Sequence, residues 1–152
     1  MIQDRDLLRP SLTAGRGSPP AIYSARTGFL ASFFGGPIAG ALVALLNSQR
    51  LRRLRVDGPI VLLALVVSLA LRWSIMVYGE RGLENALGKG GAMTIARFIG
   101  PAFFGVVYAL HRRYYRGMSL LAIPVPNGLR VGILASALGL GVEIALAAVA
   151  VK

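Results

Sequence analysis

The sequence predicts an all-α membrane protein with four transmembrane helices in an antiparallel bundle. The 152 residues are 55% hydrophobic and 15% charged, with a mean hydropathy of +0.65, whereas soluble domains are typically about 25% charged. Four apolar runs reach the length of about 20 residues that crosses a bilayer. Because short connections join these runs, neighbours in the sequence are expected to pack as antiparallel neighbours.

The apolar runs set the expected boundaries of a transmembrane domain over residues 27–152, with helices at about 27–46, 59–78, 92–110 and 129–151. Residues 1–26 are polar and rich in proline, and are expected to form a flexible tail or, alternatively, an arm that binds a partner. The stretches "FFGGP" and "FIGP" in the first and third runs resemble each other. This repeat favours two similar helical hairpins, and chance similarity between apolar segments is the alternative.

The first expected helix contains "FFGGPIAG", with Gly35, Gly36 and Pro37 near its middle. In water, Pro costs a helix about 3 kcal/mol and Gly about 1 kcal/mol relative to Ala, but in lipid neighbouring helices satisfy the freed backbone groups. A kink is expected at this stretch. Gly36 and Gly40 form a pair of small residues on one face, against which the third or fourth helix of the same chain is expected to pack, with a partner subunit as the alternative.

The later helices carry similar small-residue positions. Gly100 and Pro101 lie one turn from Arg97 in the third run. In the fourth run, a spacing of 4, 3 and 4 residues places four side chains on one face: Gly132, Ser136, Gly139 and Glu143. This face allows close approach of another helix.

Three charged residues lie inside the apolar runs: Arg72, Arg97 and Glu143. Each lies about 20 Å from the same end of its helix, and a charge at such depth requires a partner or a route to water. Arg97 with Glu143 is the preferred pair, and Arg72 is the second candidate. The charges form either a structural clamp of small net stability or a proton- or cation-coupling site. In a third arrangement the arginines reach the headgroups and Glu143 pairs with another subunit.

The loops after the first and third runs are basic and are expected to contact anionic headgroups or a partner. Eight arginines lie in these two loops, against seven Lys and Arg residues outside the runs elsewhere. The positive-inside rule therefore places these loops in the cytoplasm and both termini outside, although so small an excess also permits insertion in both orientations. The candidate contact residues are Arg50, Arg52, Arg53, Arg55, Arg112, Arg113 and Arg116.

The sequence contains no recognisable catalytic residue set, metal-ligand spacing or cofactor motif. Its single histidine, His111, precedes two arginines and is interpreted as facing the headgroups. The absence of cysteine excludes disulfides and thiolate metal sites. The net charge of +11 is concentrated between membrane-length runs, which favours anionic lipid rather than nucleic acid as the partner.

The segment "YSARTGFLASFFGGPIAGALVALLNSQRLRR", Tyr23 to Arg53, resembles the opening of a loose group of small, uncharacterised bacterial membrane proteins. The shared features are a Tyr-Ser element, F-x-G-G-P-x-A-G and a following Asn, which is Asn47 here. The resemblance implies a multi-pass protein of the bacterial inner membrane and implies no activity.

These observations predict a small, non-catalytic accessory or assembly subunit of a larger membrane complex. The alternative is a small oligomeric transporter or channel, with Glu143 and the two intramembrane arginines as its charge site. The expected partners are therefore the lipid bilayer and either a larger membrane protein or further copies of this chain.

Overall fold

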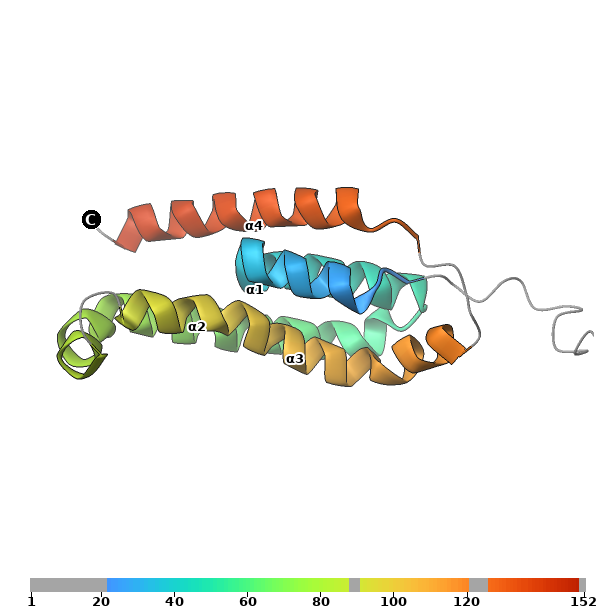
Figure 1. The fold of residues 1–152 in the computed structure, drawn as a ribbon, viewed down its shortest axis with the longest axis horizontal. Helices are drawn as coiled ribbons and strands as arrows, with labels where there is room; N and C mark the ends of the chain where they lie inside the picture. Colours follow the sequence, from blue (N-terminus) through green and yellow to red (C-terminus); the bar gives the residue numbers. More distant parts are fainter. Residues whose placement is uncertain (1–21, 88–90, 121–125, 151–152) are drawn as a thin grey trace, which may run out of the picture.

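The computed structural model describes residues 22–87, 91–120 and 126–150, and within these ranges every regular element is an α-helix. The helices are α1 (Ala25–Arg50), α2 (Leu54–Leu87), α3 (Gly91–Leu120) and α4 (Leu129–Ala150) (Figure 1). All four are long and apolar enough to cross a membrane. The predicted fold class, an all-α bundle of four helices of membrane-spanning length, is confirmed, while most of the expected tail, residues 1–21, lies outside the described residues.

The helices α2 and α3 extend beyond their predicted apolar runs. The helix α2 begins five residues earlier than expected, and α3 continues ten residues further, through "HRRYYRGMSL". Hydropathy marks only the part of a helix that lies in hydrocarbon, and a helix continues past that part until its sequence stops supporting it. The helix α4 ends within one residue of the predicted position.

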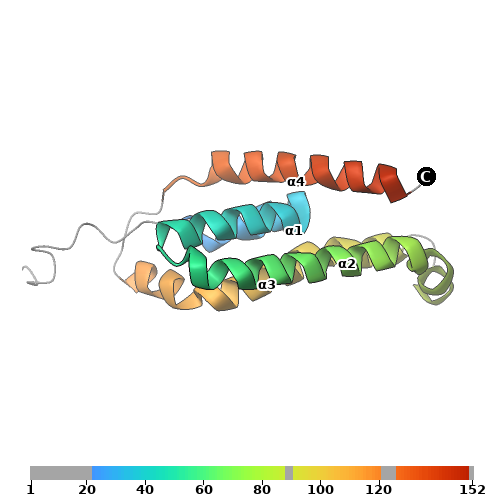
Figure 2. The same cartoon turned by 180° about the vertical axis from the view of Figure 1, so that it is seen from behind.

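The helix α1 reverses direction at Gly36, which has φ 66° and ψ −166°, a conformation almost restricted to glycine. The Tyr23 N–H, just before α1, donates to Oδ1 of Asn47 near its other end at 2.8 Å. In a straight helix these residues would lie about 36 Å apart. The two arms of α1, residues 25–35 and 37–50, therefore form an antiparallel pair, which is called the hairpin below (Figures 1 and 2).

The hairpin is re-entrant, because it begins and ends at the same end of the molecule. Each arm is about 16–21 Å long, roughly half the hydrocarbon thickness or a little more. Non-helical backbone at membrane depth is tolerated where protein buries it, and Gly36 and Pro37 are buried. Pro37 suits the first position of the second arm because its missing N–H would have no helical partner there. The expected kink is thus a full reversal.

The reversal decides which segments share an end of the molecule. The start of α1, the turn between α1 and α2, the end of α3 and the start of α4 lie at one end of the molecule, whereas α2 ends and α3 begins near the end of α4 (Figures 1 and 2). The first group is called the basic end, because it holds Arg26, Arg50, Arg52, Arg53, Arg55, Arg112, Arg113, Arg116 and Arg130. The expectation that the N-terminal segment lies opposite loops one and three is therefore wrong, because α1 does not cross to the other end.

The hairpin forms the centre of the structure. One hydrophobic cluster joins it to α4 and includes Ala39, Val43 and Ala135. A second cluster joins it to α2 and α3 and includes Ala44, Val61 and Phe103. The other faces of α2 and α4 expose large apolar side chains, as lipid-facing helices do.

Candidate intramembrane charge site

The tip of the hairpin, Gly35 to Pro37, is in close backbone contact with α3 and α4. A Cβ at Gly35 would overlap the Cα of Ser136, and a Cβ at Gly139 would overlap the carbonyl oxygen of Gly35. On the other side, a Cβ at Gly100 would overlap the carbonyl oxygen of Ser32. The small residues that the sequence indicated on three helices therefore meet at this tip, where only glycine leaves room for the neighbouring backbone.

The remaining small-residue positions lie along the arms. A Cβ at Gly40 would overlap Oγ of Ser32 on the facing arm and would lie 3.1 Å from the ring of Phe103. A Cβ at Gly132 would lie 3.4 Å from Cγ2 of Thr27, which is ordinary contact. Pro101, next to Gly100 in α3, is half-buried. Gly40 thus separates the arms, whereas Gly132 borders a less crowded part of the interface between α1 and α4.

An ion pair lies against the tip of the hairpin. Nη1 of Arg72 in α2 donates to Oε1 of Glu143 in α4 at 2.7 Å. The exposed fractions of the two side chains are 23% and 10%. A Cβ at Gly36 would overlap the Glu143 carboxylate and would lie 3.1 Å from Nη1 of Arg72. The pair therefore connects α2 and α4 across the point where α1 turns back.

The preferred pairing of Arg97 with Glu143 is wrong, and the second candidate, Arg72, is the partner. Arg97 is exposed and forms no ion pair within the described residues. The hairpin accounts for this outcome, because it packs between α3 and α4 and separates the helices that the prediction treated as neighbours. The hairpin ends at its tip, and beyond the tip it does not separate α2 from α4. The long Arg72 side chain reaches Glu143 there.

A cavity of about 370 Å³ opens beside the ion pair, between α2 and α4. Arg72 and Glu143 are its charged lining residues, and Trp73, Met76 and Leu146 are among its apolar ones. Arg72 is the one cation among the described residues that line the cavity, so a carboxylate in such a place can take up a proton when its guanidinium partner moves away. Among the described residues no group of three or more acidic or histidine side chains is arranged to hold a metal ion.

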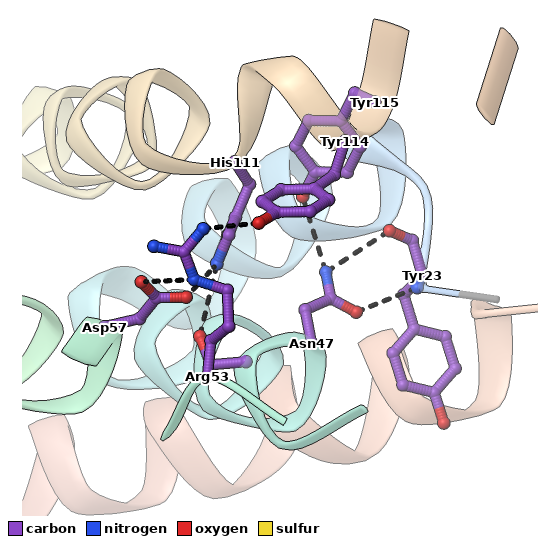
Figure 3. A network of polar contacts seen from close by, with 8 residues as sticks. Tyr23, Asn47, Arg53, Asp57, His111, Tyr114 and Tyr115 are labelled. Atoms are coloured by element: carbon purple, nitrogen blue, oxygen red, sulfur yellow. Dashed lines mark hydrogen bonds and ion pairs between the residues drawn. The ribbon is translucent and has the colours of Figure 1, made fainter. Parts of the chain in front are cut away.

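The base of the hairpin is closed by buried polar groups (Figure 3). Asn47 is fully buried and accepts from the Tyr23 N–H through Oδ1 at 2.8 Å. Its Nδ2 donates to the Tyr23 carbonyl oxygen at 3.3 Å and to the Tyr115 hydroxyl at 3.4 Å. One amide side chain thus satisfies both backbone groups of the residue that precedes the first arm and also connects the hairpin to α3.

His111 is fully buried, so its interpretation as a headgroup-facing residue is wrong. Its Nε2 lies 3.1 Å from Oγ of Ser48 and 3.3 Å from Oδ2 of Asp57, and its Nδ1 has no hydrogen-bond partner among the described residues. A serine–histidine–aspartate relay requires the two partners on opposite ring nitrogens. Here both partners meet the same nitrogen, and the three side chains form a buried polar contact instead of a relay.

Asp57 connects this contact to the basic end. It is 1% exposed, and Oδ1 lies 3.7 Å from Nε of Arg53, which also donates to the Tyr114 hydroxyl (Figure 3). The hydrogen bond with Tyr114 and the charge of Asp57 raise the pKa of the Arg53 guanidinium above its usual range. Arg53 therefore carries its charge at any physiological pH and faces Asp57 as a cation.

The predicted headgroup-contact arginines are all exposed at the basic end. Two of them also bind aromatic side chains: Arg50 donates to the Tyr23 hydroxyl at 2.7 Å and lies 4.1 Å over its ring, and Arg53 binds Tyr114. Such contacts fix the aliphatic part of each side chain while the charge stays accessible.

Sequence reasoning missed the buried polar groups at the base: Asn47, Ser48, Asp57 and the partnership of His111. One signal was available, because Asp57 is the single carboxylate in a loop of four arginines and an acidic residue there requires a partner. The positions of Asn47 and Tyr23 carried no such signal, because 24 residues separate them and only the reversal of α1 brings them together.

In comparisons with protein-family models, curated proteins and solved structures, nothing matched this chain. The resemblance of Tyr23–Arg53 to a group of bacterial membrane proteins accordingly stays a prediction.

Proposed function

We propose that the protein is a small transport protein of the bacterial inner membrane, in which the hairpin and the Arg72–Glu143 pair form a gate. The observation that carries this proposal is the position of the pair: it lies against the broken backbone at Gly36 and beside a cavity. Broken or re-entrant helices at membrane depth line the substrate routes of channels and transporters, and an ionisable group inside the membrane is a functional-site hypothesis by default.

A proton is the proposed permeant. A metal cation requires several oxygen ligands, and the described residues around Glu143 provide one carboxylate that already binds a guanidinium at 2.7 Å. Movement of Arg72 away from Glu143 frees that carboxylate to accept a proton from the cavity. Transfer toward the basic end then requires the closely packed tip to shift, so that the site faces one end at a time.

The proposed orientation places the basic end in the cytoplasm. Nine arginines of the described residues lie there, whereas Arg81 is the basic residue of the described ranges that lies outside the apolar runs toward the other end, near the end of α2. This excess is larger than the one expected for a spanning first helix, because the start of α1 lies at the same end as loops one and three (Figures 1 and 2). The positive-inside rule favours the end with more Lys and Arg close to the membrane.

The test is proton flux into proteoliposomes that contain a pH-sensitive dye and carry an imposed pH gradient. Wild-type protein is expected to dissipate the gradient faster than empty vesicles, and Glu143→Gln is expected to lower the rate to the empty-vesicle value. Arg97→Gln is the matched control, because it removes an intramembrane charge that lies outside the ion pair. Wild-type rates equal to those of empty vesicles would refute the proposal.

An accessory subunit is the second candidate function, and the length of α2 favours it. With 34 residues, α2 is longer than the stretch of about 20 residues that crosses the hydrocarbon, and its candidate span, Leu54–Tyr78, ends before the helix does. The rest of the helix, at the end of the molecule opposite the basic end, is therefore proposed to lie outside the bilayer, where a partner has access to it. Copurification of one larger membrane protein in fixed stoichiometry, together with absent proton flux, would favour this function over transport.

A further inference from the structure

We propose that the groove between the first arm of α1 and α4 is a binding site for one anionic phospholipid of the leaflet at the basic end. The groove has a volume of about 710 Å³, within the range of ligand sites of about 300–1,000 Å³. It is separate from the cavity beside the Arg72–Glu143 pair, with which it shares no lining residue. The proposal does not depend on transport.

The mouth of the groove is polar and positively charged. Arg26, Ser24 and Asn127 line it, and Arg26 is exposed. Both flanking helices begin here, with Ser24 capping α1 and Asn127 accepting from the Leu129 N–H at 3.1 Å. The positive ends of two helix dipoles therefore add to the arginine charge. This combination matches a phosphate group at the depth of the headgroups.

The interior of the groove is apolar. Leu30 and Phe34 from α1 and Ile133 from α4 line it below the mouth, and all three are exposed large hydrophobic residues. They lie on helices that run side by side from the basic end toward the tip of the hairpin (Figures 1 and 2). An acyl chain attached to a headgroup at Arg26 lies along this path, and a soluble phosphate compound would leave the apolar part unused.

Small residues along its border keep the groove open. Gly132 faces Thr27 across the interface without crowding, since a Cβ there would lie 3.4 Å from the Thr27 methyl carbon. A larger side chain at position 132 therefore fits the helix and projects into space that the lipid would occupy. A substitution at position 132 therefore tests the contact with the acyl chain, whereas a substitution of Arg26 tests the contact with the headgroup.

The test is native mass spectrometry of the full chain, purified in detergent and mixed with equal amounts of phosphatidylglycerol and phosphatidylethanolamine of identical acyl chains. We expect one retained lipid per chain, with phosphatidylglycerol favoured about fivefold, the effect of one arginine near a membrane surface. Arg26→Gln should abolish the preference, and Gly132→Leu should lower retention of both lipids. Arg130→Gln is the matched control, because Arg130 is an exposed arginine at the same end outside the groove lining.

The proposal would be overturned by equal retention of the two lipids by the wild type, by equal losses in Arg26→Gln and Arg130→Gln, by displacement of the lipid by inorganic phosphate, or by unchanged retention in Gly132→Leu. A dimer that excludes lipid would identify a second copy of the chain as the occupant of the groove instead. Circular dichroism of each variant establishes that its helices are intact, and a Gly132→Ala variant, which adds one methyl group, replaces Gly132→Leu if that variant does not fold.

Discussion

The base of the hairpin is closed by hydrogen bonds between buried polar groups, whereas its tip is closed by backbone contact and a single ion pair. At the base, Asn47 satisfies both backbone groups of Tyr23. At the tip, Gly35, Gly100 and Gly139 bring three segments together at a distance that no Cβ permits. The base therefore depends on the chemistry of a few side chains, and the tip depends on the absence of side chains.

This difference suits the two parts to different roles. A buried hydrogen bond whose partner is lost leaves a polar group unsatisfied, which costs about 1–3 kcal/mol, so the base is expected to hold its arrangement. The tip is fixed by packing and by a pair that is partly exposed. Movement of the hairpin is accordingly expected at its tip, with the base as the fixed point.

The largest expected effect is the cross-linking of the two arms. A Cβ at Gly28 would lie 4.0 Å from Cγ1 of Val43, so Gly28→Cys with Val43→Cys should form a disulfide within one chain on mild oxidation. In a straight helix the two positions would lie about 22 Å apart, beyond the reach of about 7 Å between Cα atoms. Because the chain has no cysteine of its own, mass spectrometry detects this disulfide without interference from other thiols. The control is the pair Gly28→Cys with Ala148→Cys. Failure of the first pair to cross-link would contradict the reversal of α1.

The next effect is the loss of stability in Gly36→Ala. An alanine at φ 66° is strained and its methyl group would overlap Glu143, which together should cost on the order of 3 kcal/mol. Thermal unfolding in detergent measures this loss. Gly141→Ala is the control, because a Cβ there meets nothing within 4 Å, and it should leave stability unchanged. Equal stability of the two variants would show that the tip is not closely packed.

A smaller loss is expected at the base from Asn47→Ala. The substitution leaves the buried Tyr23 N–H without its acceptor, at a cost of about 2 kcal/mol. The same unfolding measurement tests this value, with the exposed Gln49 replaced by Ala as the control. Hydrogen exchange should also become faster at Tyr23, and unchanged exchange there would indicate that Asn47 does not close the hairpin.

The smallest effect is expected from Glu143→Gln, which removes the charge that faces Arg72. The amide oxygen that replaces the carboxylate can still accept from Nη1 of Arg72, so the substitution removes the charge of the acceptor and keeps a hydrogen bond, at a cost of about 1 kcal/mol. The swap Arg72→Glu with Glu143→Arg should recover most of this loss, and Arg97→Gln should change stability by less than about 0.5 kcal/mol. A larger loss of stability in Arg97→Gln than in Glu143→Gln would support the predicted pairing of Arg97 with Glu143 and contradict the Arg72–Glu143 pair of the structure.

Much of the tip could be predicted from the sequence, because its signals are local. Glycine and proline in an apolar run indicate a distortion, and the spacing of Gly132, Ser136, Gly139 and Glu143 indicates one helical face wherever the helix packs. The base could not be predicted in the same way. Its contacts join Tyr23 to Asn47 and His111 to Asp57, and such pairs depend on the path of the chain between them.

Hydropathy, the length of each apolar run and the level of the internal charges follow from the amino-acid sequence itself, since each is a property of consecutive residues at a fixed rise of about 1.5 Å. Only the tertiary structure decides that α1 turns back at Gly36, because a kinked crossing helix and a re-entrant hairpin have the same apolar length. That reversal then determines which end is basic, why Arg72 rather than Arg97 reaches Glu143, and why His111 is buried. Each of these depends on which segments are adjacent in space.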